Sequence, residues 1–212
     1  MHYQHIIWDY NGTLLNDVKL CVDVINKVLF KRSLPLLTIK KYKEIFDFPV
    51  KDYYRRLGFD FEKESFEIVG TEFIVEYDKS DKSKLLHTGA NEFLTELKSQ
   101  GIEQSVLSAR EEVQLLCELK DLGVYELFTE VVGLNDHYAG GKTENGKELI
   151  EKLNISKDQI LMIGDTKHDA DVANECGIDC ILLAHGHHAE EKLETCGVPV
   201  LNDFEKLRNY LL

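Results

Sequence analysis

Residues 5–15, His-Ile-Ile-Trp-Asp-Tyr-Asn-Gly-Thr-Leu-Leu, join a short apolar run to an acidic residue and a glycine. Ile6, Ile7 and Trp8 follow one another without polar alternation, which is typical of a central strand in a parallel sheet. Asp9 then lies at the carboxyl end of that strand, where open α/β sheets bind their ligands. Gly12 allows a sharp turn, and the Thr13 hydroxyl can hold the loop or a phosphate oxygen. The segment therefore predicts a parallel α/β sheet with a ligand site beside Asp9.

After Leu15 the pattern changes from strand to helix. Apolar residues at helical spacing predict a first helix that Asn16 or Asp17 can cap and that ends at Leu34-Pro35. Further helices are expected over 37–46, 50–57 and 62–78, with no strand as clear as the first. Residues 15–85 are therefore expected to form an all-helical insertion.

In the remainder of the chain, strands and helices alternate. Strands are expected at 102–107, 131–133, 159–163, 180–183 and 198–201, and helices at 89–100, 110–122, 142–153, 169–176, 189–195 and 204–211. This alternation specifies a parallel sheet with helices on both faces. We predict an α/β protein with a Rossmann-like core domain formed by residues 1–14 and 86–212, and an inserted all-helical cap domain formed by residues 15–85.

The charge of the chain excludes two classes of partner. Its 212 residues carry a formal net charge of −13, whereas nucleic acids and anionic membranes require clustered Lys and Arg. There is no run of 18 apolar residues and no charged-then-apolar leader, so we expect a cytoplasmic protein. The five cysteines are scattered, which fits reduced core thiols better than a disulfide framework.

Three further stretches carry polar side chains at a strand end or a helix start. Ser108 follows the strand Gln-Ser-Val-Leu, and Lys142 opens a helix after Gly140-Gly141. Taken singly, a serine at a strand end is usually structural and a lysine at a helix start is usually solvated. Asp165 and Asp169 follow five apolar residues and a glycine and stand one helical turn apart. Capping of the next helix is the alternative explanation for both aspartates.

Asp-Tyr-Asn-Gly-Thr-Leu at 9–14 resembles the Asp-x-Asp-Gly-Thr-Leu nucleophile motif of the haloacid dehalogenase superfamily, and the other three stretches resemble its later motifs in the same order. The resemblance extends over the whole chain and is to the phosphoglycolate phosphatase branch, which implies a Mg²⁺-dependent phosphatase. Asp9 is implied as a nucleophile that forms an aspartyl phosphate. The implied metal ligands are Asp9, Asp165, Asp169 and the main-chain carbonyl of Asn11. Mg²⁺ suits this set because it prefers oxygen ligands and because a carboxylate would otherwise repel a phosphate dianion.

The same resemblance implies how the substrate is held. Ser108, the backbone after it at Ala109, Lys142 and Thr13 would bind the phosphoryl group of a small-molecule ester. Arg55, in the helical insertion, can reach the leaving group, although a solvated helix face is the alternative for this arginine. The protein is expected to act as a monomer or homodimer.

Asn11 departs from the motif, because the superfamily has its acid–base aspartate at this position. An amide cannot protonate a departing alkoxide or take a proton from water, a role commonly worth about 10²–10⁴-fold in rate. Three functions stay open: an attenuated phosphatase, a phosphate-ester binding protein without useful turnover, and phosphonatase-like or other unusual bond cleavage. His168 is a candidate replacement for the missing acid, with a surface position as the alternative.

His185, His187 and His188 flank Gly186 after the expected strand at 180–183. Zinc is conceivable there, but no nearby Cys or His completes a ligand set. We therefore expect a loop at the rim of the site.

Overall fold

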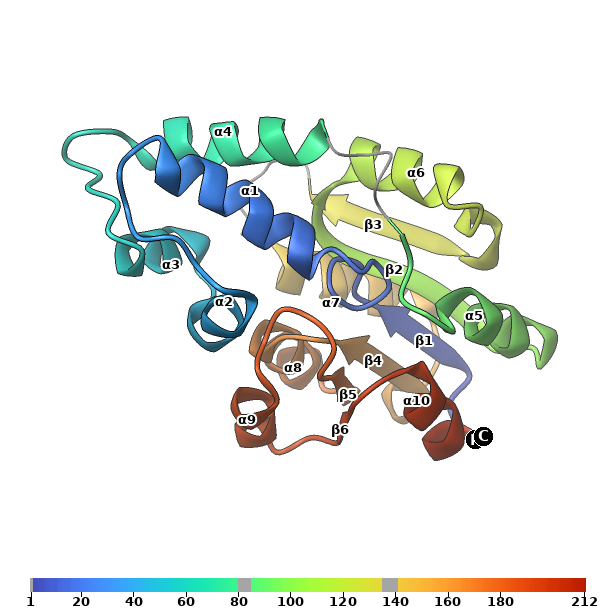
Figure 1. Cartoon of the computed structure of the whole chain (residues 1–212). Coiled ribbons are helices and arrows are strands. Elements are labelled where there is room, and N and C mark those ends of the chain that lie inside the picture. Colours follow the sequence, from blue (N-terminus) through green and yellow to red (C-terminus); the bar gives the residue numbers. More distant parts are fainter. Residues whose placement is uncertain (1, 80–84, 135–140) are drawn as a thin grey trace.

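The structure is a computed structural model that describes residues 2–79, 85–134 and 141–212. Six parallel strands form one sheet in the order β3-β2-β1-β4-β5-β6 (Figure 1). The strands are β1 His5–Trp8, β2 Glu103–Glu111, β3 Glu130–Leu134, β4 Ile160–Gly164, β5 Asp179–Leu183 and β6 Val200–Leu201. Because β1 lies between β2 and β4, the strand order reverses beside it. Open α/β sheets bind ligands at such a reversal.

The central strands β1 and β4 are buried on both faces, which explains the unbroken apolar run in β1. Ile6 and Trp8 face a cluster that includes side chains of α5 (Ala90–Ser99), α6 (Glu112–Asp121) and α10 (Phe204–Leu211). Ile7 points to the other face, where it meets side chains of α7 (Lys142–Leu153) and α8 (Lys167–Cys176). The short helix α9 (Glu190–Leu193) adds Leu193 to this second cluster.

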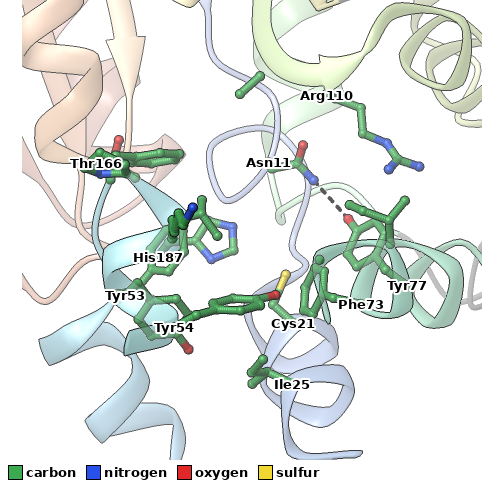
Figure 2. Close-up of a pocket in the computed structure, with 18 of the residues that line it drawn as sticks. Asn11, Cys21, Ile25, Tyr53, Tyr54, Phe73, Tyr77, Arg110, Thr166 and His187 are labelled. Atoms are coloured by element: carbon green, nitrogen blue, oxygen red, sulfur yellow. Dashed lines mark hydrogen bonds between the residues drawn. The ribbon is translucent and has the colours of Figure 1, made fainter. Parts of the chain in front are cut away.

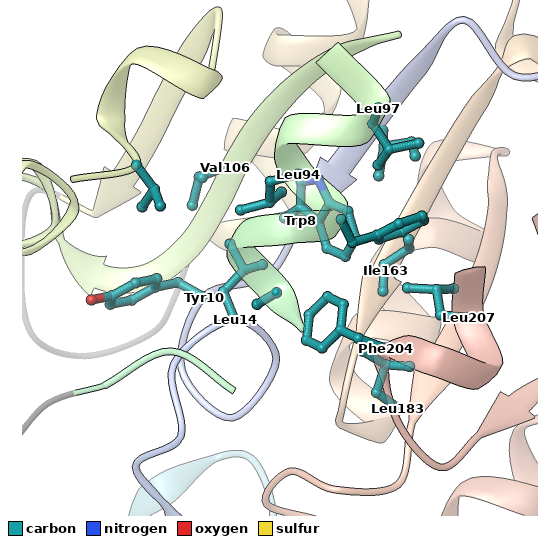
Figure 3. Packing of buried hydrophobic residues seen from close by; sticks show 14 of the residues in the cluster. Trp8, Tyr10, Leu14, Leu94, Leu97, Val106, Ile163, Leu183, Phe204 and Leu207 are labelled. Carbon is teal, nitrogen blue, oxygen red and sulfur yellow. The ribbon is translucent and has the colours of Figure 1, made fainter. Parts of the chain in front are cut away.

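Trp8 is the centre of the first cluster (Figure 3). Its ring lies edge-on to Phe93 at 6.2 Å between centroids and 5.9 Å from Phe204. Its indole N–H donates to Oε1 of Gln104 at 3.1 Å, so the one polar atom of the side chain is satisfied. This packing holds the end of β1, and with it Asp9, against helices on one face of the sheet.

Between β1 and α5 the described residues form four helices, α1 Val18–Phe30, α2 Ile39–Ile45, α3 Val50–Arg56 and α4 Phe66–Asp78, here called the helical block. Their buried side chains form a cluster drawn only from residues 18–77. The helices α1 and α4 run side by side (Figure 1). The helical block thus has a hydrophobic core of its own. This fits the predicted division into a core domain of residues 1–14 and 86–212 and a cap domain of residues 15–85, and we keep that division as a proposal.

Several contacts join the helical block to the sheet part of the chain. The backbones of residues 14–16 and 85–87 run antiparallel and exchange hydrogen bonds of 2.8 and 2.9 Å. At the end of α4, the Asp78 carboxylate pairs with the Arg110 guanidinium of β2 at 2.5 Å. On the other side, the Lys43 ammonium of α2 donates to the Ala184 carbonyl at 2.9 Å, and the Lys43 carbonyl accepts from the Ala189 amide at 3.1 Å. The block is therefore attached beside the carboxyl ends of β1 and β2 and to the segment that follows β5.

The predicted fold class is confirmed by this sheet and its helices. The predicted end of the second strand is wrong, because β2 continues to Glu111 through a shift of its pairing with β3 between Leu107 and Glu111. Ser108 and Ala109 consequently lie within the strand. Asp17 precedes α1, but its side chain caps no helix N–H. No helix of the described residues is long and apolar enough to cross a membrane.

Candidate active site

Three buried carboxylates meet at the carboxyl ends of β1 and β4. Asp9 follows β1, Asp165 follows β4, and Asp169 belongs to the first turn of α8. Their residues are 6%, 0% and 1% exposed, and one oxygen of each lies within 4.8 Å of the others. Carboxylates so close together and so far from water repel one another unless cations or protons offset their charge.

Lys142, the first residue of α7, supplies one such cation. Its ammonium lies 2.5 Å from Oδ1 of Asp9 and 2.6 Å from Oδ1 of Asp169. Burial alone lowers the pKa of Lys142, but the charges of Asp169 and Asp9 outweigh burial and raise that pKa above its usual value. The lysine therefore stays charged and fixes the orientation of Asp9.

Asp9 and Asp165 share a single hydroxyl. Oγ1 of Thr13 lies 3.1 Å from Oδ2 of Asp9 and 2.7 Å from Oδ1 of Asp165, yet a hydroxyl has only one proton to donate. Burial raises the pKa of Asp9 well above its usual range and that of Asp165 to about 6, and the nearby Asp169 acts in the same direction on both. The negative charges of the Asp9 and Asp165 carboxylates are therefore not fully offset by the groups around them. An all-oxygen donor set of this kind suits a hard divalent cation such as Mg²⁺.

Two glycines allow the chain to close around Asp165. Gly12 has a φ of +81°, and a Cβ at that position would overlap Oδ2 of Asp165. Gly186 lies against the same carboxylate, where a Cβ would overlap it as well. The next amide, that of His187, donates to Oδ2 of Asp165 at 2.5 Å. A larger residue at position 12 or 186 would displace the carboxylate.

Asp169 already has partners in the protein for both oxygens. Oδ1 binds Lys142, while Oδ2 accepts from the Thr166 amide at 3.0 Å and the Thr166 hydroxyl at 2.7 Å. Burial alone raises the pKa of Asp169, but Lys142 overcomes this effect and lowers the pKa to about 2. These contacts support a role in positioning Lys142 and the start of α8 more than the predicted role as a metal ligand.

Ser108 and Ala109 line the same cavity as Asp9 and Lys142. Oγ of Ser108 accepts a hydrogen bond from the Arg110 amide at 3.1 Å, which leaves its own proton to donate. The structure therefore brings the predicted phosphate-binding residues to the side of Asp9.

Asn11 faces a second buried carboxylate, that of Asp17. Nδ2 of Asn11 donates to Oδ2 of Asp17 and to the Tyr77 hydroxyl, each at 2.9 Å. Tyr77 itself donates to Oδ2 of Asp17 at 2.7 Å, and the Gly12 amide donates to Oδ1 at 2.9 Å. The sequence suggested only helix capping for Asp17. In the fold, the Asp17 carboxylate accepts a hydrogen bond from the side-chain amide of Asn11. An ionised aspartate at position 11 could not donate this hydrogen bond.

His187 balances the charge of Asp17. Its Nε2 lies 3.2 Å from Oδ1 of Asp17, and its Nδ1 lies 2.9 Å from the Tyr42 hydroxyl. Burial alone lowers the pKa of His187, but Asp17 raises it to about 9, so the histidine is cationic at neutral pH. The ion pair with His187 in turn holds the pKa of Asp17 below its usual range, although burial alone would raise it. The sequence grouped His187 with two neighbouring histidines and offered no signal that linked it to Asp17.

Arg55 and His168 differ in how they relate to the cavity. Arg55 is exposed, pairs with Asp52 and does not line the cavity, so the predicted contact with a substrate is not supported. The same helix, α3, presents Lys51 to the cavity instead. His168 does line it, against the ring of Phe48 at 4.7 Å, and burial lowers the pKa of this histidine.

A cavity of about 650 Å³ lies between the sheet edge and the helical block. Figure 2 shows Asn11 at one end of this space, with Phe73 and Tyr77 on one side and Tyr53 and Tyr54 on the other. Asp9, Ser108 and Lys142 also line this cavity, so a molecule in it can touch both the sheet part and the helical block.

Residues 6–183 match the family of haloacid dehalogenase-like hydrolases. The chain belongs to this family. It is 24% identical to a phosphoglycolate phosphatase of Rhodospirillum rubrum over 97% of the chain and 90% of the relative. It is 22% identical to the tyrosine-protein kinase PtkA of Mycobacterium tuberculosis over 93% of the chain and 68% of the relative.

Among solved structures, a haloacid dehalogenase-like hydrolase from Streptococcus pneumoniae superposes with a TM-score of 0.85 at 17% identity, covering 100% of this chain and 99% of the other. The predicted family and enzyme class, a phosphatase of the haloacid dehalogenase type resembling phosphoglycolate phosphatases, are confirmed by these comparisons. The relatives carry names that imply different activities, so the substrate must be argued from the cavity of this chain.

Replacing Lys142 by Met removes the cation between Asp9 and Asp169, and we expect a loss of about 3–5 kcal/mol in stability at pH 7 without Mg²⁺. Without the lysine, the folded-state pKa values of both carboxyls lie above their unfolded values. The folded state then binds more protons than the unfolded state between those values, so the deficit should shrink as the pH falls from 7 to 5.

Urea unfolding of Lys142→Met and wild type at both pH values measures this effect. Lys147→Met, which changes an exposed lysine on the same helix, is the control. A deficit that is equal at pH 7 and pH 5 would show that Lys142 does not neutralise these carboxylates.

Proposed function

We propose that this protein is a Mg²⁺-dependent phosphatase that hydrolyses a small-molecule phosphate monoester through an aspartyl phosphate on Asp9. The observation that carries the proposal is the convergence of Asp9 and Asp165 on one hydroxyl, beside a lysine already shared with Asp169. Asp9, Asp165 and the main-chain carbonyl of Asn11 would hold the metal. Once bound, Mg²⁺ offsets the negative charge of the nucleophile and the phosphate.

The residues around Asp9 fit the steps of phosphoryl transfer, which is mainly a problem of positioning and charge. Lys142 and Thr13 orient the Asp9 carboxylate for attack on phosphorus. An oxygen of Asp9 forms a bond to phosphorus as the ester oxygen departs. Lys142, the Ser108 hydroxyl and the Ala109 amide bind the phosphoryl oxygens, and water then hydrolyses the aspartyl phosphate.

Hydrolysis of p-nitrophenyl phosphate with and without Mg²⁺ tests this function. Asp9→Asn should lower turnover by more than about 10³-fold, because it removes the nucleophile. Asp171→Asn, which changes an exposed aspartate on α8, is the matched control and should retain activity. Acid quenching should trap phosphoenzyme on wild type but not on Asp9→Asn. The proposal fails if wild type with Mg²⁺ hydrolyses neither this ester nor any alkyl ester.

Metal binding is tested separately from turnover. At a Mg²⁺ concentration of 100 Kd, binding to the folded state adds about 2.7 kcal/mol of stability, which is a rise in Tm of roughly 5–10 °C for a chain of this size. Asp165→Asn should abolish the rise, since it removes one of the two carboxylates, whereas Asp171→Asn should preserve it. An equal rise in wild type and Asp165→Asn would place the ion elsewhere.

Asn11 favours a second candidate, a phosphate-ester binding protein with little turnover. The amide of Asn11 donates to Asp17 and has no proton of suitable acidity for an alkoxide leaving group. This candidate shares the whole phosphate site with the first and differs only in the step that needs a proton.

Restoring an aspartate at position 11 separates the two candidates. Asn11→Asp alone places a carboxylate against Asp17, so we expect less gain from it than from Asn11→Asp/Asp17→Asn, in which the amide and the carboxylate exchange places. The double variant should raise kcat/KM for alkyl phosphates by about 10²–10⁴-fold, and that for p-nitrophenyl phosphate by much less, because this phenolate departs unprotonated. Asp17→Asn alone is the control. If wild type already hydrolyses alkyl esters as fast as the double variant, another group supplies the proton.

A further inference from the structure

The part of the cavity formed by the helical block is lined mainly by aromatic and aliphatic side chains. They include Phe46, Phe48, Tyr54, Phe66, Phe73 and Ile74. A pocket of about 650 Å³ with such a lining is of the size and character that holds a bulky apolar group. The leaving group of an ester whose phosphate lies beside Asp9 would extend along this wall.

Among the described residues, the cationic side chains that line the cavity already form ion pairs with carboxylates, with one exception. Lys142 serves Asp9 and Asp169, and His187 serves Asp17. The third, the guanidinium of Arg110, pairs with Asp78 at 2.5 Å and with Glu118 at 2.7 Å.

The exception is Lys51, which is exposed and lies 5.9 Å from the ring centroids of Phe61 and Phe66. Besides Asp9 and Asp169, three more acids, Asp17, Glu67 and Asp78, line the cavity. A carboxylate on the leaving group would lose its hydration on entering the cavity. Among the described residues, the wall offers no unpaired buried cation to replace that hydration, so binding of such a group is unfavourable.

One polar atom in the wall has no partner. The hydroxyl of Tyr53 is buried and makes no hydrogen bond to any described residue, although the side chain lines the cavity. Because this oxygen is itself buried, it offers a bound molecule no accessible polar atom, and Tyr53 presents its ring to the cavity as part of the apolar wall.

We propose, on the basis of the phosphatase function proposed above, that the substrate is a phosphate monoester of a bulky, uncharged alcohol that carries an aromatic or similarly apolar group. Small carboxylated esters such as 2-phosphoglycolate are then poor substrates. The apolar wall binds the alcohol portion.

The test compares 2-phenylethyl phosphate, ethyl phosphate and 2-phosphoglycolate with Mg²⁺ present. The first two are unactivated alkyl esters, so the difference between them reports contact with the wall and not a better leaving group. Burial of the phenyl group should raise kcat/KM by about 10–100-fold over ethyl phosphate. A higher kcat/KM for 2-phosphoglycolate than for 2-phenylethyl phosphate would overturn the inference.

A binding measurement keeps this inference separate from the function on which it rests. Calorimetry with two non-hydrolysable phosphonates, 2-phenylethylphosphonate and 3-phosphonopropionate, should show tighter binding of the phenyl compound by a similar factor. If no ester turns over but this order holds, the phosphatase proposal fails and the assignment of the wall stands. If esters are turned over but 3-phosphonopropionate binds as tightly as the phenyl compound or more tightly, the phosphatase proposal stands and the assignment of the wall fails.

Two arginine substitutions on α4 locate the effect. Ile74→Arg puts a cation into the wall and should weaken binding of the phenyl phosphonate by at least about 10-fold while tightening that of the carboxylated one. Ile68→Arg, on the same helix but exposed and outside the cavity lining, should change neither. Lys51→Met should leave the preference intact. Loss of tight 3-phosphonopropionate binding in Lys51→Met would instead identify Lys51 as a carboxylate site and overturn the inference.

Discussion

The ammonium of Lys142, held between Asp9 and Asp169, is the contact on which the rest of the site depends. It joins the end of β1 to the first turns of α7 and α8, three elements that come from distant parts of the sequence. One cation cannot balance three buried carboxylates, and the remaining deficit falls on Asp9 and Asp165, which share the proton of Thr13. The structure is thus arranged for one more positive charge at the place where a nucleophile and a phosphate would meet.

Asn11 has to be understood together with Asp17. In the chain the two are six residues apart, and in the fold the amide of one donates to the carboxylate of the other. Asp17 in turn holds His187 as a cation, and Tyr77 of the helical block donates to the same oxygen. The amide at position 11 therefore belongs to a balanced polar network, and a change at this position alone leaves a buried group without its partner.

The features that could be predicted from the sequence are those encoded within short segments. Asp9 follows its own apolar strand, and Asp165 and Asp169 follow theirs, so the sheet and the placement of these side chains follow from local patterns. The pair formed by Asp17 and His187 could not be predicted, because nothing near either residue specifies the other. Arg55 illustrates the same limit: a charged residue in a helix has no local signal for which face it occupies, and here it is the exposed one.

The charge balance around Asp9 and Asp165 also affects which side chains the helical block can place in the cavity. Lys142 and His187, the cations that pair directly with the buried carboxylates of the site, both belong to the sheet part of the chain, and no described residue of α1–α4 forms an ion pair with Asp9 or Asp169. The block is then free to line its side of the cavity with rings, and it contacts the network chiefly through Tyr77 and Tyr42. Side chains that bind the leaving group can therefore vary without disturbing the carboxylates, provided that these two tyrosines stay in place. This separation explains how one arrangement of Asp9, Lys142 and Asp165 is compatible with a wall that lacks a buried cation for a carboxylated leaving group.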